Sequence, residues 1–523
     1  MKKIAETILL TMLVTVLMIV PTTITRTQAQ VLTTPLNEGP NDLDPFGNIT
    51  VSVNIKTIRS LEKNDLQIPS ITKINWLGKP NFYVKVFING VESTSQVWKR
   101  MKYVYTPDWS ATLDVPDNQE WVSVRIELWD QSLAGDKQCD LSGLNEEPIK
   151  EDRGINLTYS LKTGHWYGDD SINNMEGWMY TSDPSGYGRL CGSDDGSIYQ
   201  QDRDCELWFD ITQTDPDGDG IPSWSEINVY GTDPSVNDTG LDMDGDGCPI
   251  EWEHKWGHYF YRDWHSHNVS HRWMYSDLVW NNHTALDPDN DGLDNNEEYL
   301  TSQWGSDPFR RDMFTELDQM ATGPNGEESV FPQEAKELLR TAFDRRNIVY
   351  HLEDGSWGGE TGSETIPFQA NSSMEDLDNI YNDWFLHGDE NNWRHGVFRY
   401  GVLVYNCDAA GGMTFRSDAF QISSLCMENK AKIPFLNRNV IYASAYMHET
   451  GHTLNFNPIP GHDENSYYPW QYGWWKWRPY KSVMNYGYMY QMVDYSDGSR
   501  GKNDLNDWSP DRMDLTSFQQ FHF

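Results

Sequence analysis

One acidic motif occurs three times between residues 210 and 306, and it constrains the fold of this chain more than any other feature. The segments that begin at Asp215, Asp242 and Asp287 each fit D-x-D-x-D-G with Glu at the twelfth position. Carboxylates at positions 1, 3 and 5 face one centre when the backbone curls, and glycine at position 6 permits the sharp turn. Such crowded carboxylates would repel one another without a cation between them.

Calcium fits this spacing, because it takes six to eight oxygen ligands at about 2.3–2.6 Å. The region 211–308 also resembles the thrombospondin type 3-like and dockerin-like calcium repeats of secreted proteins, which implies a spacer stiffened by calcium. The sequence therefore predicts three calcium loops, with ligands Asp215, Asp217, Asp219 and Glu226; Asp242, Asp244, Asp246 and Glu253; and Asp287, Asp289, Asp291 and Glu298.

The charge balance supports a partner that is neither nucleic acid nor an anionic membrane. Asp and Glu number 79 against 40 Lys and Arg, so the net charge is −39. Such a chain repels polyanions, so neither nucleic acid nor an anionic membrane is expected as its partner.

The first 29 residues are predicted to be a secretory signal peptide. Lys2 and Lys3 precede an apolar run over 7–20, and small residues end at Ala29. No later run is long enough to span a bilayer, so we expect a secreted or cell-surface protein; an uncleaved signal anchor is the alternative.

Export makes disulfides and glycosylation plausible. The local pairs Cys191–Cys205 and Cys407–Cys426 are the expected disulfides among six cysteines. N-glycosylation sequons occur at Asn48, Asn156, Asn237, Asn268, Asn282 and Asn371.

Residues 30–210 are predicted to form an accessory β-sandwich. Alternating apolar residues mark strands over 81–88, 121–129 and 206–211, and Asn89-Gly90 favours a tight turn. The loop that carries Asp130, Asp136 and Asp140 resembles those of C2-type sandwiches. It is either a metal site or a solvated acidic loop.

A histidine-rich stretch separates the second and third acidic loops. It contains His254, His258, His265, His267 and His271 among many aromatic residues. We expect an insertion that packs through its aromatic side chains, with a transition-metal site as the alternative.

Residues 309–523 are predicted to form one α+β domain that carries the chemistry. Strands are expected over 311–318, 347–352 and 397–405, and helices over 332–343 and 440–454. The second helix contains the pattern H-E-x-x-H, in which His448 and His452 lie one turn apart and can bind one zinc ion. Glu449 lies beside them and can take a proton from a water that zinc activates.

The segment Ser482-Val483-Met484-Asn485-Tyr486 follows about 30 residues later. Together the two motifs resemble metzincin-type zinc endopeptidases secreted by microbes, over roughly residues 309–515. The resemblance implies a twisted sheet with helices, an apolar floor of Met484 under the metal, and Tyr486 as a ligand or a donor to the tetrahedral intermediate; a packed aromatic is the alternative for Tyr486.

The third metal ligand departs from the family pattern, because Asn455 and Pro458 replace its glycine and histidine. Asn tolerates the left-handed conformation that would end the helix there. We therefore predict His462 as the third zinc ligand, with Asp463 as competitor, or else an inactive site.

The sequence predicts a calcium-stabilised zinc endopeptidase, which implies a protein or peptide substrate. The alternatives are a catalytically degenerate adhesion or scaffold protein, or a carbohydrate-binding protein suggested by the Trp-rich segment 467–477. A protease assay with and without a zinc chelator tests the first alternative, and a glycan array tests the second.

Overall fold

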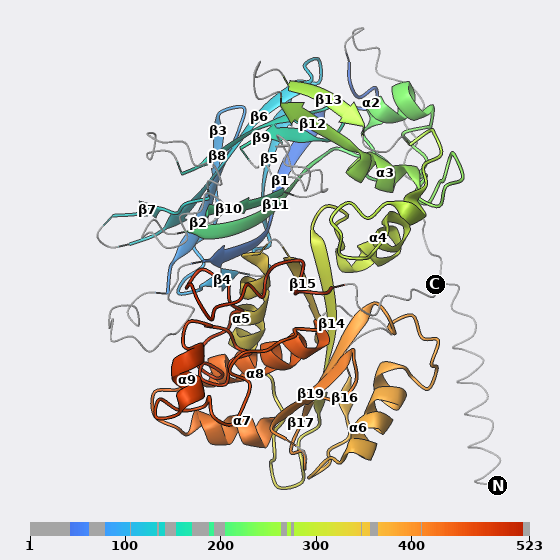
Figure 1. Cartoon of the computed structure of the whole chain (residues 1–523). Coiled ribbons are helices and arrows are strands. Elements are labelled where there is room, and N and C mark those ends of the chain that lie inside the picture. The colour runs from blue at the N-terminus through green and yellow to red at the C-terminus, as the bar shows by residue number, and fades with distance from the viewer. Residues whose placement is uncertain are drawn as a thin grey trace, which may run out of the picture.

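The computed structural model describes residues 42–61, 79–104, 106–132, 135–141, 153–169, 188–192, 204–262, 269–273, 277–346, 348–355, 364–408 and 410–515 (Figure 1). Within these ranges, the side chains of 191, 258–262 and 269–273 are excepted. The predicted signal peptide and the residues His265, His267 and Asn268 lie outside the described residues.

The N-terminal region is a β-sandwich of two sheets, in agreement with the strand pattern of the sequence. One sheet has the order β10-β11-β1-β4 with β5 also on β1, and the other has the order β3-β2-β6-β8-β9 with β7 on β6. The inward residues of both sheets form one apolar core, which includes Val53, Val84 and Ile126. Its strands are β1 (Ile49–Ser60), β2 (Phe82–Ile88), β3 (Val91–Thr94), β4 (Tyr103–Val104), β5 (Trp109–Val115), β6 (Trp121–Asp130), β7 (Lys137–Gln138), β8 (Ile155–Ser160), β9 (Trp166–Gly168), β10 (Gly188–Cys191) and β11 (Cys205–Gln213).

Two local expectations in the sandwich can be compared with the structure. Asn89 and Gly90 both have positive φ, 48° and 80°, so the predicted tight turn joins β2 to β3. In the acidic loop, Asp130 accepts a hydrogen bond from the Asn81 amide, and Asp136 accepts one from the Tyr83 hydroxyl. These two carboxylates therefore brace the loop.

The acidic region consists of short helices between loops, with one small hairpin. The helices are α2 (Ser223–Ser225), η4 (Glu226–Tyr230), α3 (Ile250–Gly257), η5 (His283–Ala285), α4 (Asn295–Thr301) and η6 (Ser302–Trp304), and the hairpin pairs β12 (His258–Arg262) with β13 (Val269–Trp273). His254 is buried, contacts the Tyr230 hydroxyl through Nδ1 and contacts the Thr163 carbonyl through Nε2. This histidine therefore packs the region against the sandwich.

The acidic region, which the sequence predicts to be a spacer between two domains, contacts both of its neighbours. Ser225 donates to the Lys162 carbonyl of the sandwich, and Leu293 belongs to the same apolar core as Phe314 and Phe398 of the C-terminal domain. The third loop thus contributes to the core on one face of the C-terminal sheet, and Figure 1 shows the acidic region between the sandwich and this sheet.

The C-terminal domain is an α/β layer structure rather than the expected α+β arrangement. Its sheet has the order β15-β14-β17-β19-β18 with β16 on β14, and only β18 runs antiparallel to its neighbour. The α5 helix returns the chain from β14 to β15, which makes this pair parallel. The strands are β14 (Arg311–Met320), β15 (Ile348–Glu353), β16 (Thr365–Ile366), β17 (Phe398–Val404), β18 (Gly412–Thr414) and β19 (Ala419–Ser423).

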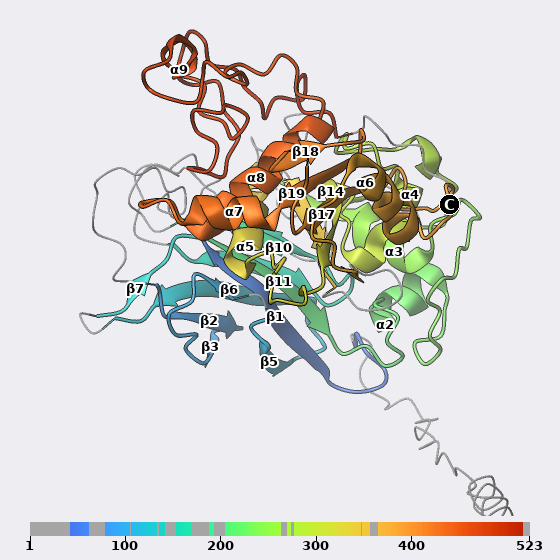
Figure 2. The same ribbon diagram turned by 90° about the horizontal axis from the view of Figure 1, so that it is seen from below.

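Helices cover both faces of this sheet (Figure 2). The large core under α5 and α8 includes Leu339, Phe420 and Tyr446, whereas the core under α6 and η7 includes Leu377, Phe385 and Tyr400. The helices are α5 (Gln333–Asp344), α6 (Met374–Ile380), η7 (Tyr381–Phe385), α7 (Ser424–Ala431), α8 (Arg438–Thr453) and α9 (Tyr472–Trp477).

The expected Cys407–Cys426 disulfide is wrong, since both cysteines are free thiols. Cys407 packs into the core under α6, whereas Cys426 packs against the core under α8. The two side chains therefore lie on opposite sides of the sheet. The side chain of Cys191 lies outside the described residues, so the expected Cys191–Cys205 disulfide stays a prediction.

Buried ion pairs join the sandwich to the C-terminal end of α5. Arg59 pairs with Asp344, and the Arg189 guanidinium bridges Glu206 at 2.6 Å and the Asp344 carbonyl at 3.1 Å. Arg345 donates to the Leu61 carbonyl. The two domains therefore share one polar, buried junction.

Candidate metal centre

The α8 helix places His448 and His452 on one face because they lie four residues apart, and both ends of the helix are well defined. The Asn437 side chain accepts hydrogen bonds from the amides of Asn439 and Val440 and caps the start. Asn455 has φ +59°, which is the left-handed conformation predicted for this position, and the chain leaves the helix there.

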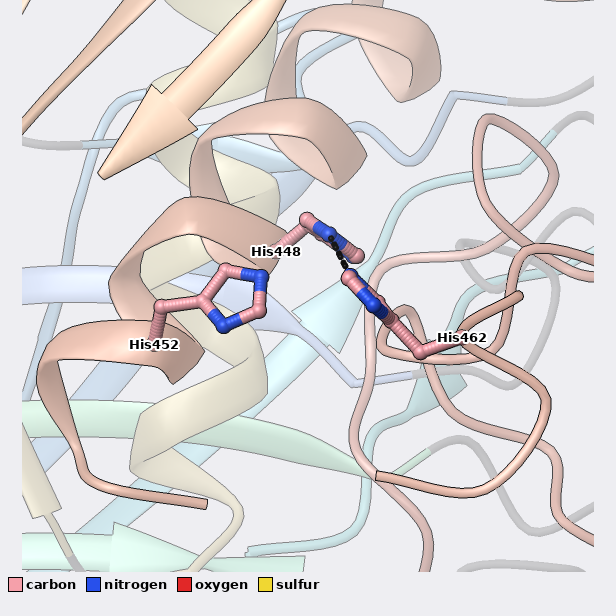
Figure 3. A group of neighbouring side chains, drawn as sticks. All are labelled: His448, His452 and His462. Carbon is pink, nitrogen blue, oxygen red and sulfur yellow. Dashed lines mark hydrogen bonds between the residues drawn. The ribbon is translucent and has the colours of Figure 1, made fainter. Parts of the chain in front are cut away.

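Three imidazoles converge at the end of this helix (Figure 3). The Nε2 atoms of His448 and His462 lie 3.2 Å apart. The His452 ring centre lies 5.0 Å from that of His448 and 4.9 Å from that of His462. One ring nitrogen from each residue falls within 4.8 Å of the other two. The structure thus brings His462 to the pair from a loop outside the helix.

The protonation of the three rings suits a metal ligand. His448 Nδ1 lies 2.8 Å from the Val483 carbonyl and donates to it, which leaves the Nε2 lone pair facing the other two rings. Burial lowers the pKa of His448 and His462, and it lowers the pKa of His452 to about 4. The imidazoles are therefore neutral at pH 7, the form in which histidine binds metals.

The spacing of the nitrogens also fits zinc. Two ligands that each lie about 2.0–2.1 Å from a tetrahedral zinc ion are about 3.3 Å apart. The His448–His462 separation of 3.2 Å matches that value.

The carboxylate of Asp463, the alternative third ligand, accepts hydrogen bonds within its own loop. Its Oδ1 accepts hydrogen bonds from the Asn465 amide at 2.8 Å and from the Ser466 hydroxyl at 3.0 Å. The Asp463 carboxylate therefore stabilises its own turn on a partly exposed loop.

The segment from Ser482 to Tyr486 contacts both α8 and the loop that carries His462. Met484 is fully buried, and its sulfur lies so close to Gly451 of α8 that a Cβ on Gly451 would be 2.4 Å away. The Tyr486 amide donates to the Gly461 carbonyl at 3.1 Å, next to His462. The same segment thus positions His448 through Val483 and His462 through Gly461.

A Gly461→Ala substitution should displace His462 and weaken metal binding. Gly461 has φ +72°, and a Cβ there would lie 2.5 Å from Asn485 Oδ1. The left-handed conformation alone costs alanine about 1–2 kcal/mol. Zinc affinity measured by competition with a chelator should fall at least about tenfold. Gly501→Ala is the matched control, because φ is +83° and nothing lies within 4 Å of a Cβ there; equal zinc affinity in both variants would contradict the positioning role.

Glu449 is buried beside the three histidines. Its Oε2 accepts a hydrogen bond from the Thr414 hydroxyl of β18 at 3.3 Å, and Glu449 is 4% exposed. Burial raises the pKa of Glu449 to about 8. Tyr486 lies against His462, with ring centres 4.2 Å apart. Burial, together with Tyr467 and Glu449, raises the pKa of Tyr486 to about 12.

The three acidic loops share one backbone conformation. In the first, the amides of Gly218 and Gly220 donate to the two oxygens of Asp215, both at 2.8 Å. The second repeats this with Asp242, at 2.7 and 3.0 Å. In the third, the Gly292 amide donates to Asp287. Each loop therefore curls its carboxylates around one centre, as the spacing predicts.

The final glutamate of each loop is buried among other carboxylates. Glu226, Glu253 and Glu298 are each at most 1% exposed. Burial and the neighbouring aspartates raise the pKa of Glu226 to about 8 and that of Glu298 well above its usual range. Both oxygens of Glu298 and one of Glu226 lack a hydrogen-bond partner among the described residues. The carboxylates of these loops form groups that could hold a metal ion.

Two residues that the motif does not contain join these clusters. An Asp238 oxygen lies within 4.8 Å of oxygens of Asp219 and Glu226 in the first loop. His283 Nε2 lies 3.2 Å from Asp246 Oδ2 and 3.3 Å from Glu253 Oε1 in the second. The sequence pattern could not reveal them, because both come from outside the twelve-residue repeat.

No family model and no curated protein matches this chain. Among solved structures, the chain is similar to a C2 domain at 12% identity (32% of this chain, 98% of that one, TM-score 0.18). It is also similar to a C2 domain of plant extended synaptotagmin 1 at 12% (32% and 95%, TM-score 0.19) and to a C2 domain protein from Ramazzottius varieornatus at 11% (36% and 96%, TM-score 0.20). Scores this low establish neither a shared fold nor a shared function, and the sandwich is evident from its own strand pairing.

Within the part of the chain that the structure describes, no helix is both long and apolar enough to cross a membrane.

Proposed function

We propose that this protein is a secreted, zinc-dependent endopeptidase of the metzincin type, stabilised by calcium. The observation that carries the proposal is the convergence of His448, His452 and His462 beside the buried carboxylate of Glu449. Three neutral imidazoles are the ligand set of a catalytic zinc site, which keeps its fourth position open.

In this proposal the chain positions a proton acceptor and a peptide. Zinc, when bound, would polarise the scissile carbonyl and lower the pKa of water to about 7. A zinc cation beside Glu449 would favour its ionised form, and the carboxylate would then take the proton of the attacking water and pass it to the leaving amine. Tyr486, which lies against His462, would donate to the oxyanion that develops on the substrate.

The edge of the sheet offers a place for the substrate backbone. The β18 strand ends the sheet order, and Thr414 of this strand contacts Glu449. An extended peptide could pair with the outer side of β18 and so pass the carboxylate. The aromatic side chains of Tyr467 and Trp470 would line its path, since Tyr467 stacks on Tyr486 at 4.6 Å and Trp470 is 78% exposed.

Calcium is proposed for the first and third loops, whose ligands are all oxygens. Besides the repeat carboxylates, Asp238 supplements the first loop, and the charge of Asp312 acts on Glu298 of the third. Hard oxygen ligands in this number suit calcium.

Two alanine variants test the zinc site. His462→Ala should lose one zinc ion per chain and all peptide hydrolysis, because two histidines hold zinc poorly. Asp463→Ala should keep both, since its carboxylate serves its own turn. Metal content by mass spectrometry and a casein-type assay are the measurements. If His462→Ala retains zinc and Asp463→Ala loses it, the third ligand is Asp463. If the parent protein does not hydrolyse peptides, the proposal that it is an endopeptidase is refuted.

A further inference from the structure

The second acidic loop differs from the other two in the chemistry of the group that enters it from outside. His283 is 1% exposed, and its Nε2 reaches both Asp246 Oδ2 at 3.2 Å and Glu253 Oε1 at 3.3 Å. These carboxylates occupy positions 5 and 12 of the repeat. An imidazole thus stands where a cation ligand belongs.

The first loop provides an internal comparison. There the carboxylates at positions 5 and 12, Asp219 and Glu226, are joined by another carboxylate, that of Asp238. The loop conformation is otherwise the same, because the glycine amides bond to Asp215 and Asp242 alike. At this position the second loop therefore has a nitrogen atom of His283, whereas the first loop has a carboxylate oxygen of Asp238.

A thiol lies at the same place. Cys248 is fully buried, and its Sγ falls within 4.8 Å of an Asp246 oxygen and a His283 ring nitrogen. Sγ also lies 3.1 Å from Asn296 Oδ1. Imidazole and thiol groups suit zinc and its neighbours, whereas calcium binds through oxygen.

The distances around His283 support a shared ion. Ligands of a tetrahedral zinc ion are about 3.3 Å apart. The separations of 3.2 and 3.3 Å from Nε2 to the two carboxylate oxygens match this value.

The second nitrogen of His283 has a partner that can orient the ring. The side-chain amide nitrogen of Asn295 lies 2.9 Å from Nδ1 of His283, and Asn295 is fully buried. Its Oδ1 lacks a hydrogen-bond partner among the described residues. Turning the amide lets Oδ1 accept the Nδ1 proton, which gives the Nε2 lone pair to the site.

We propose that the second loop is a transition-metal site that prefers a zinc-class cation to calcium, with Asp246, Glu253 and His283 as ligands and the Cys248 thiol beside them. The site is separate from the three histidines at the end of α8, because the two groups share no residue. The site connects two parts of the acidic region. His283 lies just before the third loop, Asp246 and Glu253 belong to the second, and the insertion with β12 and β13 lies between them in the sequence.

The test is the metal content of the full-length chain, equilibrated with two equivalents of zinc in excess calcium. His283→Asp gives the second loop the carboxylate that Asp238 gives the first. We expect it to lose one zinc and gain one calcium per chain. His387→Gln, a substitution of an exposed histidine, should keep the parent content. Equal zinc content in His283→Asp and the parent would overturn the proposal.

Two further measurements separate this site from the proposed active site and from a folding defect. The double variant His448→Ala, His452→Ala should retain one zinc; if it retains the full parent content, the active-site zinc is refuted and the second-loop site stands. Anomalous diffraction of the unsubstituted chain at the zinc edge should show a peak beside His283. Calcium, or no ion, at that position would overturn the proposal.

Discussion

Replacing Glu449 with glutamine should lower peptide hydrolysis by roughly a hundredfold to ten-thousandfold, the usual contribution of a general base. Glutamine keeps the shape of the side chain and its contact with Thr414 but cannot accept the proton. Since Glu449 is not one of the three converging groups, zinc content should not change. The measurement is kcat/KM on a quenched fluorescent peptide, together with metal analysis of the same sample.

Glu375→Gln is the matched control, because it makes the same chemical change at an exposed position of α6. It should retain the activity of the parent protein. Parent-like turnover by Glu449→Gln would remove this carboxylate from the mechanism, whatever metal the site contains.

Removal of calcium should lower the free energy of unfolding of the folded chain. In the third loop, Asp289, Asp291 and Glu298 are each at most 4% exposed, and their charges act on one another. A ligand at about a hundred times its Kd stabilises the folded state by about 2.7 kcal/mol per site. Two such sites therefore contribute about 5 kcal/mol, and the melting temperature should fall by several degrees when a calcium-selective chelator is added.

The third loop should dominate this effect, because it supports the C-terminal domain. The Asp312 amide at the start of β14 donates to Asp291 Oδ2 at 2.6 Å. We expect Glu298→Gln to reduce both the calcium-dependent shift and peptide hydrolysis, and Glu226→Gln in the first loop to reduce the shift alone. Identical melting curves with calcium and with chelator would contradict a stabilising role for calcium.

The elements that the sequence predicted best are those whose residues carry their own local signal. Asn455 adopts the left-handed conformation that its side chain tolerates, and α8 ends beside it. The strands over 82–88, 121–130 and 311–320 follow runs of alternating or apolar residues. Neighbouring residues determine where these elements begin and end, so the sequence alone predicts them.

What the sequence could not show depends on contacts between distant residues. Asp238 and His283 reach their loops only because the chain folds back, and no spacing marks them. The free thiols of Cys407 and Cys426 follow from which side of a sheet each one faces. The docking of the acidic region on β14 likewise rests on a backbone contact of Asp312, which no residue pattern encodes.

The junction between the sandwich and α5 determines which surface would be exposed if the two domains were separated. Its buried charges meet at Asp344 and Arg345, whereas the three histidines lie on α8 and in the loop before α9. In the view of Figure 2, α9 lies on the far side of α8 from the sandwich. Removal of the described part of the sandwich would therefore expose the buried charges at the end of α5.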